Sequence, residues 1–453
     1  MEFEAFKQFL FAEAEANGFE KVELYHVSGS GILLSIPEGE QYNMRCGVSL
    51  RGTVQGGTGT AYSEQFTEES ARYLIQTVRE NASILENDGE AYYHDGSGSY
   101  PELPPADDEL EDISRLSALR DQIWKEIESY GNLSKTTGVV HAVSSTIRIV
   151  NNQGLDVSTK SNYVYCVLYM VAERDGVLKN SLLYRGGTRL TDIDPQDLVG
   201  SGQQKANGYF GAEQVESGTY NIVFPNDTAS LLVQGFSVFF SAESVLSAIS
   251  ALKGKEGQYV ASSKVTILDD PLDPRGVFCR PFDAEGIPAV KRTLVKDGVL
   301  ESYLHSSRTA VHFEHAQPGN HHRLDYNYQS AVYPSNFYLA AGEKSLDDLI
   351  AELGDGLYVT DVTAYFHGAG INAASGEYSI PATGYVVRNG KIERPFDGVT
   401  IAGSLYDFMK NIKEVGSDLL FGLPTSFRPG APMAHGCYGS PSIRVDGITV
   451  SGK

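Results

Sequence analysis

The chain has 453 residues, of which 41% are hydrophobic and 10% aromatic, and this length predicts two or three domains rather than one. Its formal charge of -22 repels phosphate backbones and anionic lipid head groups, so neither nucleic acid nor a membrane surface is an expected partner. The acidic, amphipathic start does not resemble a signal peptide, and no stretch reaches the roughly 18 apolar residues of a membrane helix. Together with four widely spaced cysteines, this pattern is typical of a cytoplasmic protein with reduced thiols.

An N-terminal α+β unit is predicted over residues 1–88. Apolar residues at helical spacing indicate one helix that ends before Gly18 and another that includes Ala71 to Ala82. Alternating strands and a glycine-rich turn lie between the two helices. The Gly-, Pro- and acid-rich residues 87–108 then predict an exposed connection.

A central unit is predicted over residues 107–210. It begins with a helix whose apolar residues run from Leu110 to Ile127. The pattern then changes to period two, which predicts an antiparallel meander with a hairpin turn at Asp175-Gly176.

The C-terminal unit, residues 211–453, is predicted to be mainly antiparallel β structure around one long helix. That helix is expected from Asn226 to Lys253, and it lacks a polar face in its middle, which predicts burial on several sides. Hairpin turns are expected at Asp297-Gly298 and Asn389-Gly390. The fold class as a whole is therefore α+β.

Three segments of the last third carry a resemblance to a known family: DPRGVFCRPFDAEGIPAVKRTLVKDGVLESYL, GAGINAASGEYSIPATGYVVRNGKIERPFDGVTIAGSL and SPSIRVDGITVSG. In order and spacing they resemble the C-terminal domain of the TldD/PmbA family, peptidase-like proteins that are also called modulators of DNA gyrase. The N-terminal pattern resembles the first domain of that family more weakly. The resemblance covers nearly the whole chain and is greatest to the PmbA (TldE) branch.

The resemblance implies a difference at the metal site. Members of the TldD branch carry HExxxH, in which two imidazoles hold zinc and the glutamate takes a proton from metal-bound water. The corresponding stretch here is LLVQGFSV, which places Val233 and Val238 at the histidine positions and Gln234 at the glutamate position. Valine cannot bind zinc and an amide cannot act as a base, so we expect no zinc in this chain and no catalytic residue at this site.

A cysteine near the C terminus is also associated with the TldD branch. Cys437 is a candidate for that role, although the alignment places the family cysteine nearer Thr425 to Arg428. A buried or loop thiol is the alternative interpretation.

Half of the ten histidines lie in the segment HSSRTAVHFEHAQPGNHHR. If His312 and His315 shared a helical turn, they would present two imidazoles on one face, and a third would come from His321 or His322. The competing interpretation is a polar loop or groove wall that includes all five histidines. They are His305, His312, His315, His321 and His322.

The leading functional hypothesis is a metal-free, non-catalytic subunit of a two-subunit metalloprotease. The resemblance implies a TldD-type partner that holds the zinc, and unfolded peptides or small proteins as substrates. Without the partner, the chain would use the same surface to form a homodimer. One alternative is a metallopeptidase active on its own through the segment His305 to His322. A second is a non-enzymatic regulator of gyrase or of a toxin–antitoxin pair.

Overall fold

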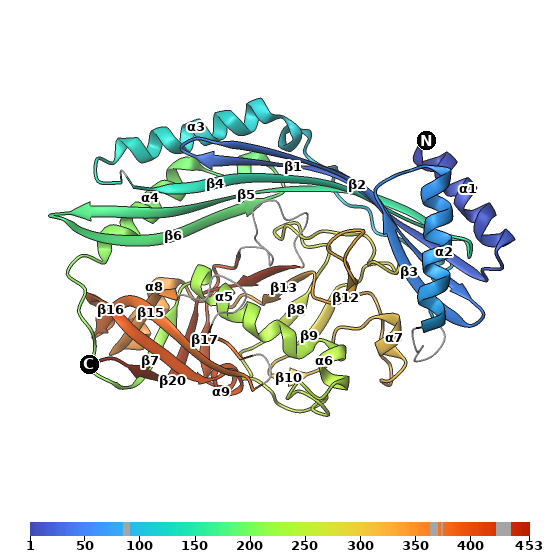
Figure 1. Ribbon diagram of the computed structural model, residues 1–453. Helices are drawn as coiled ribbons and strands as arrows, with labels where there is room; N and C mark the ends of the chain where they lie inside the picture. Colours follow the sequence, from blue (N-terminus) through green and yellow to red (C-terminus); the bar gives the residue numbers. More distant parts are fainter. Residues whose placement is uncertain (85–90, 134, 363–369, 373–374, 423–435) are drawn as a thin grey trace.

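The computed structural model describes residues 1–84, 91–133, 135–362, 370–372, 375–422 and 436–453. A long N-terminal sheet lies over a C-terminal domain of shorter strands (Figure 1). Helices and strands are mixed throughout, which confirms the α+β fold class. Among the described residues, no helix is both long and apolar enough to span a bilayer.

The N-terminal sheet has six strands in the order β3-β2-β1-β4-β5-β6, and every neighbouring pair is antiparallel. Two of the strands, β1 and β4, pair along nearly their whole length and occupy its centre. The strands are β1 (Lys21–Ile36), β2 (Glu40–Val54), β3 (Gly57–Ser63), β4 (Thr137–Asn151), β5 (Asp156–Arg174) and β6 (Val177–Gly187).

This sheet is shared by the two N-terminal units that the sequence predicts, residues 1–88 and 107–210. The first unit contributes β1 to β3 and the second contributes β4 to β6. The β1–β4 ladder joins them, so the connection at residues 91–107 does not separate two sheets, and Tyr93 and His94 within it are buried instead of exposed as predicted.

Four helices cover this sheet, and in the three that the sequence predicts, apolar side chains at helical spacing face it; the fourth, α4, was not predicted. Helices α1 and α2 pack at one end of the sheet, whereas α3 and α4 pack on the apolar residues of β1, β4 and β5 (Figure 1). The helices are α1 (Phe3–Ala16), α2 (Glu68–Ile84), α3 (Ile113–Ser129) and α4 (Pro195–Gly208), with 3₁₀ turns η1 (Asp108–Glu111) and η2 (Leu190–Asp192).

The C-terminal domain contains two six-stranded sheets, ordered β10-β9-β8-β13-β19-β18 and β16-β15-β14-β7-β20-β17. Strand β16 also pairs with β20, which closes five strands of the second sheet into a ring. Most pairs are antiparallel, as predicted, but β13–β19 and β14–β7 are parallel.

The strands of this domain range from two residues in β10 to 14 in β16. The strands of its sheets are β7 (Gly218–Phe224), β8 (Ile267–Asp269), β9 (Arg292–Lys296), β10 (Val299–Leu300), β13 (Asn336–Leu339), β14 (Gly356–Val362), β15 (Glu377–Arg388), β16 (Lys391–Ser404), β17 (Ile412–Val415), β18 (Leu420–Phe421), β19 (Cys437–Ser440) and β20 (Ile443–Ser451). A separate pair is β11 (His321–His322) and β12 (Ala331–Val332), and the short helices are α7 (Ser307–Ala310), α8 (Leu346–Leu353) and α9 (Leu405–Lys410).

The predicted hairpin turns are present. The pairs Asp175-Gly176, Asp297-Gly298 and Asn389-Gly390 all have positive φ at both residues, and each joins two antiparallel strands. Positive φ at both central residues is the conformation that matches the twist of a two-residue hairpin, which explains the Asp/Asn-Gly signal.

The prediction of one long helix from Asn226 to Lys253 is wrong. The segment forms α5 (Asn226–Ser237), the 3₁₀ turn η3 (Val238–Phe240) and α6 (Ala242–Leu246). The helix breaks at Ser241, which is extended, because the amide of Ala242 donates to the carbonyl of Leu304 and the amide of Leu304 donates to the carbonyl of Phe240. Pairing with a distant segment therefore replaces the helical hydrogen bonds.

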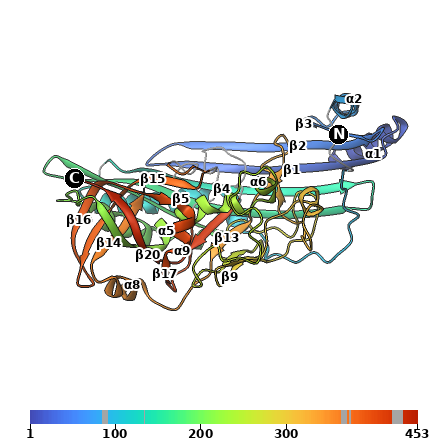
Figure 2. The ribbon, with the colours of Figure 1, turned by 90° about the horizontal axis from the view of Figure 1, so that it is seen from below.

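The C-terminal domain contacts the face of the N-terminal sheet opposite to α3 and α4. In the view from below, it lies along the sheet, away from α1 and α2 (Figure 2). Phe282 and Tyr326 pack with apolar residues of β1 and β4. Gly47 of β2 permits this approach, because a Cβ atom there would lie 2.5 Å from the Tyr326 ring.

Candidate functional site

The residues that the sequence resemblance aligns with HExxxH lie at the end of α5 and the start of η3. Val233 is buried in the largest apolar cluster, and Gln234 and Val238 are half-buried beside it. Hydrocarbon and amide side chains provide no ligand that holds zinc in proteins. The residues present therefore do not fit the metal that the HExxxH branch binds.

A cleft with a volume of about 1110 Å³ lies elsewhere, between the β2–β3 end of the N-terminal sheet and the loops around α6, α7 and β11. Its lining is rich in tyrosines and charged side chains. The tyrosines are Tyr62, Tyr92, Tyr93, Tyr326 and Tyr328, and the charged residues include Lys21, Arg51, Arg308, Arg323, Glu243 and Glu285.

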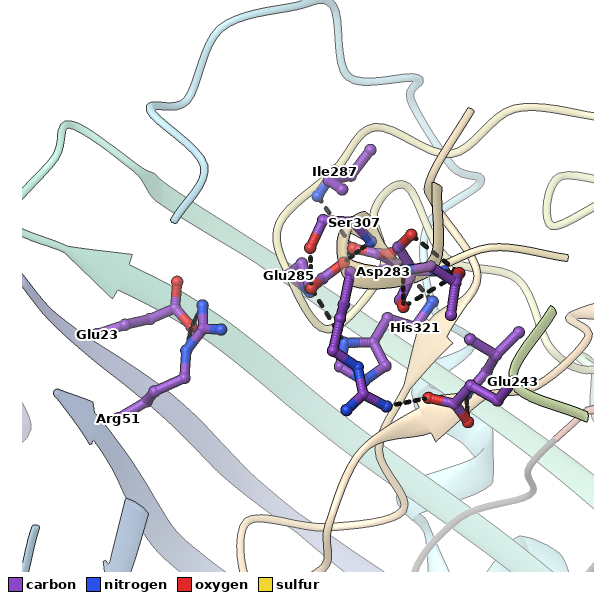
Figure 3. A network of polar contacts seen from close by, with 12 residues as sticks. Glu23, Arg51, Glu243, Asp283, Glu285, Ile287, Ser307 and His321 are labelled. Carbon is purple, nitrogen blue, oxygen red and sulfur yellow. Dashed lines mark hydrogen bonds and ion pairs between the residues drawn. The ribbon is translucent and has the colours of Figure 1, made fainter. Parts of the chain in front are cut away.

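One wall of the cleft holds a buried polar network. The Glu285 carboxylate accepts hydrogen bonds from the amide of Ser307 at 2.8 Å and from its hydroxyl at 2.5 Å. His321 Nδ1 lies 3.3 Å from Glu285 Oε1. Asp283 fixes the backbone, since its carboxylate accepts from the amides of Glu285, Ile287 and His321 (Figure 3).

Two ion pairs flank this network. Glu243 of α6 accepts from Arg308 at 3.3 Å and from the amide of Val332 at 3.2 Å. On the other side of the cleft, Arg51 donates twice to one oxygen of Glu23, at 2.8 and 3.1 Å. Figure 3 shows this second pair on strands of the sheet, apart from the network.

The buried groups have shifted pKa values. Burial raises the pKa of Asp283. Burial also acts to raise the pKa of Glu285, but His321 and Ser307 lower it below its usual value. For His321, burial acts to lower the pKa, and the carboxylates of Glu285, Asp283 and Glu243 raise it above 6.5. Both shifts favour the ion pair of protonated His321 with the Glu285 carboxylate.

This arrangement is suited to binding and not to nucleophilic attack. The Ser307 hydroxyl donates to the Glu285 carboxylate, and the lowered pKa of that carboxylate makes it a weak base for activating the hydroxyl. The exposed tyrosine faces and the charged groups are instead typical of a surface that holds a polar, extended ligand.

The Glu285–His321 pair makes stability depend on pH. The raised pKa of His321 gives a contribution that is complete below pH 6.5 and is lost as pH rises through the folded value. The lowered pKa of Glu285 gives a contribution to stability that is complete above pH 4.5 and is lost as pH falls through the folded value. A double-mutant cycle with Glu285→Gln and His321→Gln should therefore give a coupling energy of about 1–3 kcal/mol near pH 5.5, from urea unfolding.

The same coupling should fall as pH rises through the folded pKa of His321, because the imidazole then loses its charge. The Glu23–Arg51 pair provides the matched control, because the guanidinium keeps its charge throughout. Equal coupling between Glu285 and His321 on both sides of the His321 pKa would show that the pair is not charged.

The structure separates the five histidines of the predicted cluster. His305 and His322 are buried, where His305 lies 3.3 Å from the Thr309 hydroxyl and His322 lies 3.2 Å from the Ser335 hydroxyl. His312 and His315 are exposed, and only His312 and His321 line the cleft.

The shared helical turn expected for His312 and His315 is absent. Helix α7 ends at Ala310, and His315 adopts a φ of 60°. A capping box between Ser306 and Thr309 stabilises the start of this helix, which has a single turn. Within the described ranges, no three His, Cys, Asp or Glu side chains are grouped closely enough to hold a metal ion.

Cys437 is a buried thiol in β19, packed with Phe278, and burial raises its pKa to about 12. A nucleophilic cysteine needs exposure and a lowered pKa, so Cys437 lacks both properties. The positions Thr425 to Arg428, where the family cysteine aligns, lie outside the described residues.

Sequence analysis missed most of the cleft. Asp283 and Glu285 lie in the motif FDAEGIP, within a segment that carried the family resemblance, but no role was assigned to them. Arg51, Glu243 and Arg323 are far apart in the chain, and only the packing of the sheet against the C-terminal loops brings them to one cleft.

Comparison with known proteins places this architecture in a class of metallopeptidase-like proteins. The PmbA/TldA metallopeptidase central domain matches residues 101–206, and the PmbA/TldA metallopeptidase C-terminal domain matches residues 217–452. The chain belongs to the PmbA/TldD family.

Curated relatives have metalloprotease names. A metalloprotease of Methanothermobacter thermautotrophicus is 29% identical over 329 residues, which are 71% of this chain and 70% of that protein. Metalloprotease PmbA of Escherichia coli O157:H7 is 27% identical over 58% of this chain, and the match spans only 55% of that relative.

Solved structures share the fold over nearly the whole chain. A putative modulator of a DNA gyrase from Thermotoga maritima has a TM-score of 0.87 and 26% identity, covering 99% of this chain and 100% of that one. TldE from Thermococcus kodakarensis has a TM-score of 0.85 at 20% identity, with 99% and 100% covered, and this similarity concerns the fold alone.

Proposed function

We propose that the chain is the non-catalytic subunit of a PmbA/TldD-type metalloprotease, corresponding to the PmbA (TldE) branch. The observation that carries the proposal is the replacement of the HExxxH residues by Val233, Gln234 and Val238 in a fold that is otherwise that of the family. Val233 is buried in the same apolar cluster as Leu232 and Phe236, so its side chain contributes to packing. This packing explains why the fold persists without the metal.

The proposed partner is a TldD-type subunit that carries zinc. The zinc would supply a Lewis acid and activated water in that subunit, while this chain would contribute binding surface. The free state of all four cysteines agrees with the proposed cytoplasmic location. Alone, the chain would form a homodimer through the surface that otherwise contacts the partner.

The proposed substrate is an unfolded peptide or small protein, held in extended form. The cleft supports this proposal because it is lined by tyrosines, of which Tyr62, Tyr92 and Tyr328 are exposed. Tyrosines bind varied peptides with little loss of side-chain entropy. The alternative of independent catalysis by the histidine segment is weakened by the separation of its imidazoles, and no observation favours a regulator of gyrase.

Metal analysis tests this proposal. After dialysis, the purified chain should hold far less than one zinc per molecule, because its α5 positions provide no ligand. Inductively coupled plasma mass spectrometry of this chain and of a TldD-type protein prepared in parallel gives the measurement. One zinc per chain that is lost in the double variant His312→Ala and His321→Ala would instead establish an independent metallopeptidase.

A further inference from the structure

A single arginine in the cleft stands apart from the other charged residues. Arg323 follows β11 and lines the cleft, and its guanidinium lies 4.9 Å from the centre of the Tyr25 ring. Its Nε atom is buried and has no hydrogen-bond partner. Among the described residues, Arg323 forms no ion pair, although a guanidinium keeps its charge in proteins.

The carboxylates near Arg323 are already engaged by other cations. Glu23 is bonded to Arg51, and Asp325 lies 3.4 Å from Arg45. Across the cleft, Glu285 pairs with His321 and Glu243 with Arg308. The positive charge of Arg323 is thus not balanced by these acids.

The surroundings of Arg323 increase the cost of this unbalanced charge. Burial lowers the pKa of Arg323 and the nearby Arg51 also acts to lower it, and these effects outweigh the opposing effects of Tyr25 and Glu23. A partly desolvated cation gains most from an anion that hydrogen-bonds to it, and the planar guanidinium matches the two oxygens of a carboxylate. An anionic ligand in the cleft would supply that partner.

We propose that Arg323 is a carboxylate-binding subsite of the cleft, which holds the C-terminal or side-chain carboxylate of a bound peptide. The inference rests on the proposed role of the cleft as a peptide groove. A peptide carboxylate fits better than a phosphate, because a phosphate carries more negative charge and is repelled more strongly by this acidic chain. The cleft itself also contains Glu243 and Glu285. A singly charged group on an otherwise neutral peptide experiences the least repulsion.

The orientation of the subsite adds a second requirement. The cation–π contact with the Tyr25 ring holds the guanidinium in place before the ligand binds. A lysine at this position would keep the charge but lose the fork and the stacking surface. Binding should therefore depend on the shape of the cation as well as on its charge.

The test is fluorescence anisotropy with labelled, unstructured peptides of one sequence. One peptide has a free C terminus and an internal Glu, a second is amidated at the C terminus, a third carries Glu→Gln, and a fourth has both changes. They are titrated with the full chain, alone and mixed with a TldD-type protein. We expect the peptide without carboxylates to bind at least about 10-fold more weakly than the best acid peptide, and the second and third identify the source of the carboxylate.

Two variants and one control locate the effect. Arg323→Gln should weaken the binding of the acid peptide by about 10-fold or more and leave the binding of the peptide without carboxylates unchanged. Arg323→Lys should restore only part of the lost affinity. Arg275→Gln is the matched control, because Arg275 also stacks on a tyrosine but lies outside the cleft and pairs with Asp273. Thermal unfolding of each variant verifies that it is folded.

Each contrary outcome overturns the inference. These outcomes are equal binding of acid and amidated peptides, equal binding by the wild type and Arg323→Gln, and Arg323-dependent binding of inorganic phosphate without any of the peptide. If peptides bind independently of Arg323, the subsite is wrong but the peptide groove stands. If no peptide binds even in the mixture, the subsite is also wrong, and metal content and reconstituted cleavage then decide separately on the proposed function.

Discussion

Replacing Lys205 with methionine is expected to lower the free energy of unfolding by about 3–5 kcal/mol. Lys205 of α4 lies 3.4 Å from Asp227 of α5 and 3.5 Å from Asp361 of β14. Burial acts to lower the pKa of Lys205, but the two carboxylates raise it above its usual value. The cation therefore joins the central unit to the C-terminal domain, and its loss would leave two half-buried carboxylates without a cation.

Urea unfolding near pH 7 tests this expectation. Lys205→Met combined with Asp361→Asn should be more stable than Lys205→Met alone, because one unpaired carboxylate is removed. Lys135→Met is the matched control, since Lys135 and Glu173 form an exposed pair whose loss should cost no more than about 1 kcal/mol. If both lysine variants lost the same small amount, Lys205 would not be a structural link between the two parts.

The second large effect concerns assembly. We expect a TldD-type protein to cleave an unfolded peptide roughly 100-fold more slowly when this chain is absent. Under the proposed function, the zinc subunit performs the chemistry and this chain helps to position the substrate. Incorrect placement of a substrate by about 1 Å is enough to cause a loss of that size.

Features that depend on neighbouring residues could be predicted from the sequence. The burial of Leu74 and Val78 in α2 follows from their helical spacing, and the hairpin at Asn389-Gly390 follows from two residues that tolerate positive φ. The capping box between Ser345 and Asp348 is likewise a local signal. In each case the residues that decide the structure lie within one or two turns of each other.

Features that depend on distant pairing could not be predicted in this way. The end of the helix before Ser241 is caused by Leu304, and no signal near Ser241 indicates it. The ladder between β1 and β4 joins segments more than 100 residues apart, so composition indicated only a connection between two units. The separation of the histidines could not be predicted for a related reason, because His305 and His322 are buried in the tertiary structure while His315 faces solvent.

The candidate site shows the same limit. The absence of zinc ligands at Val233 and Val238 could be recognised from the family motif, since it is a matter of residue type. The cleft could not be predicted, because Arg51 on β2, Glu285 and Arg323 are far apart in the chain. They line one cleft because the C-terminal loops pack on the sheet, where Tyr326 approaches Gly47. Local patterns therefore identify the family, whereas the binding surface emerges from tertiary packing.

The most direct test of the central claim is a reconstitution assay. A zinc-loaded TldD-type protein is titrated with this chain, and cleavage of a quenched fluorescent peptide is followed for each protein alone and for the mixture. The non-catalytic subunit account predicts no cleavage by this chain alone, little by the partner alone, and a rise that saturates at a fixed ratio of the two. Equal cleavage by the partner with and without this chain, or cleavage by this chain alone, would contradict it.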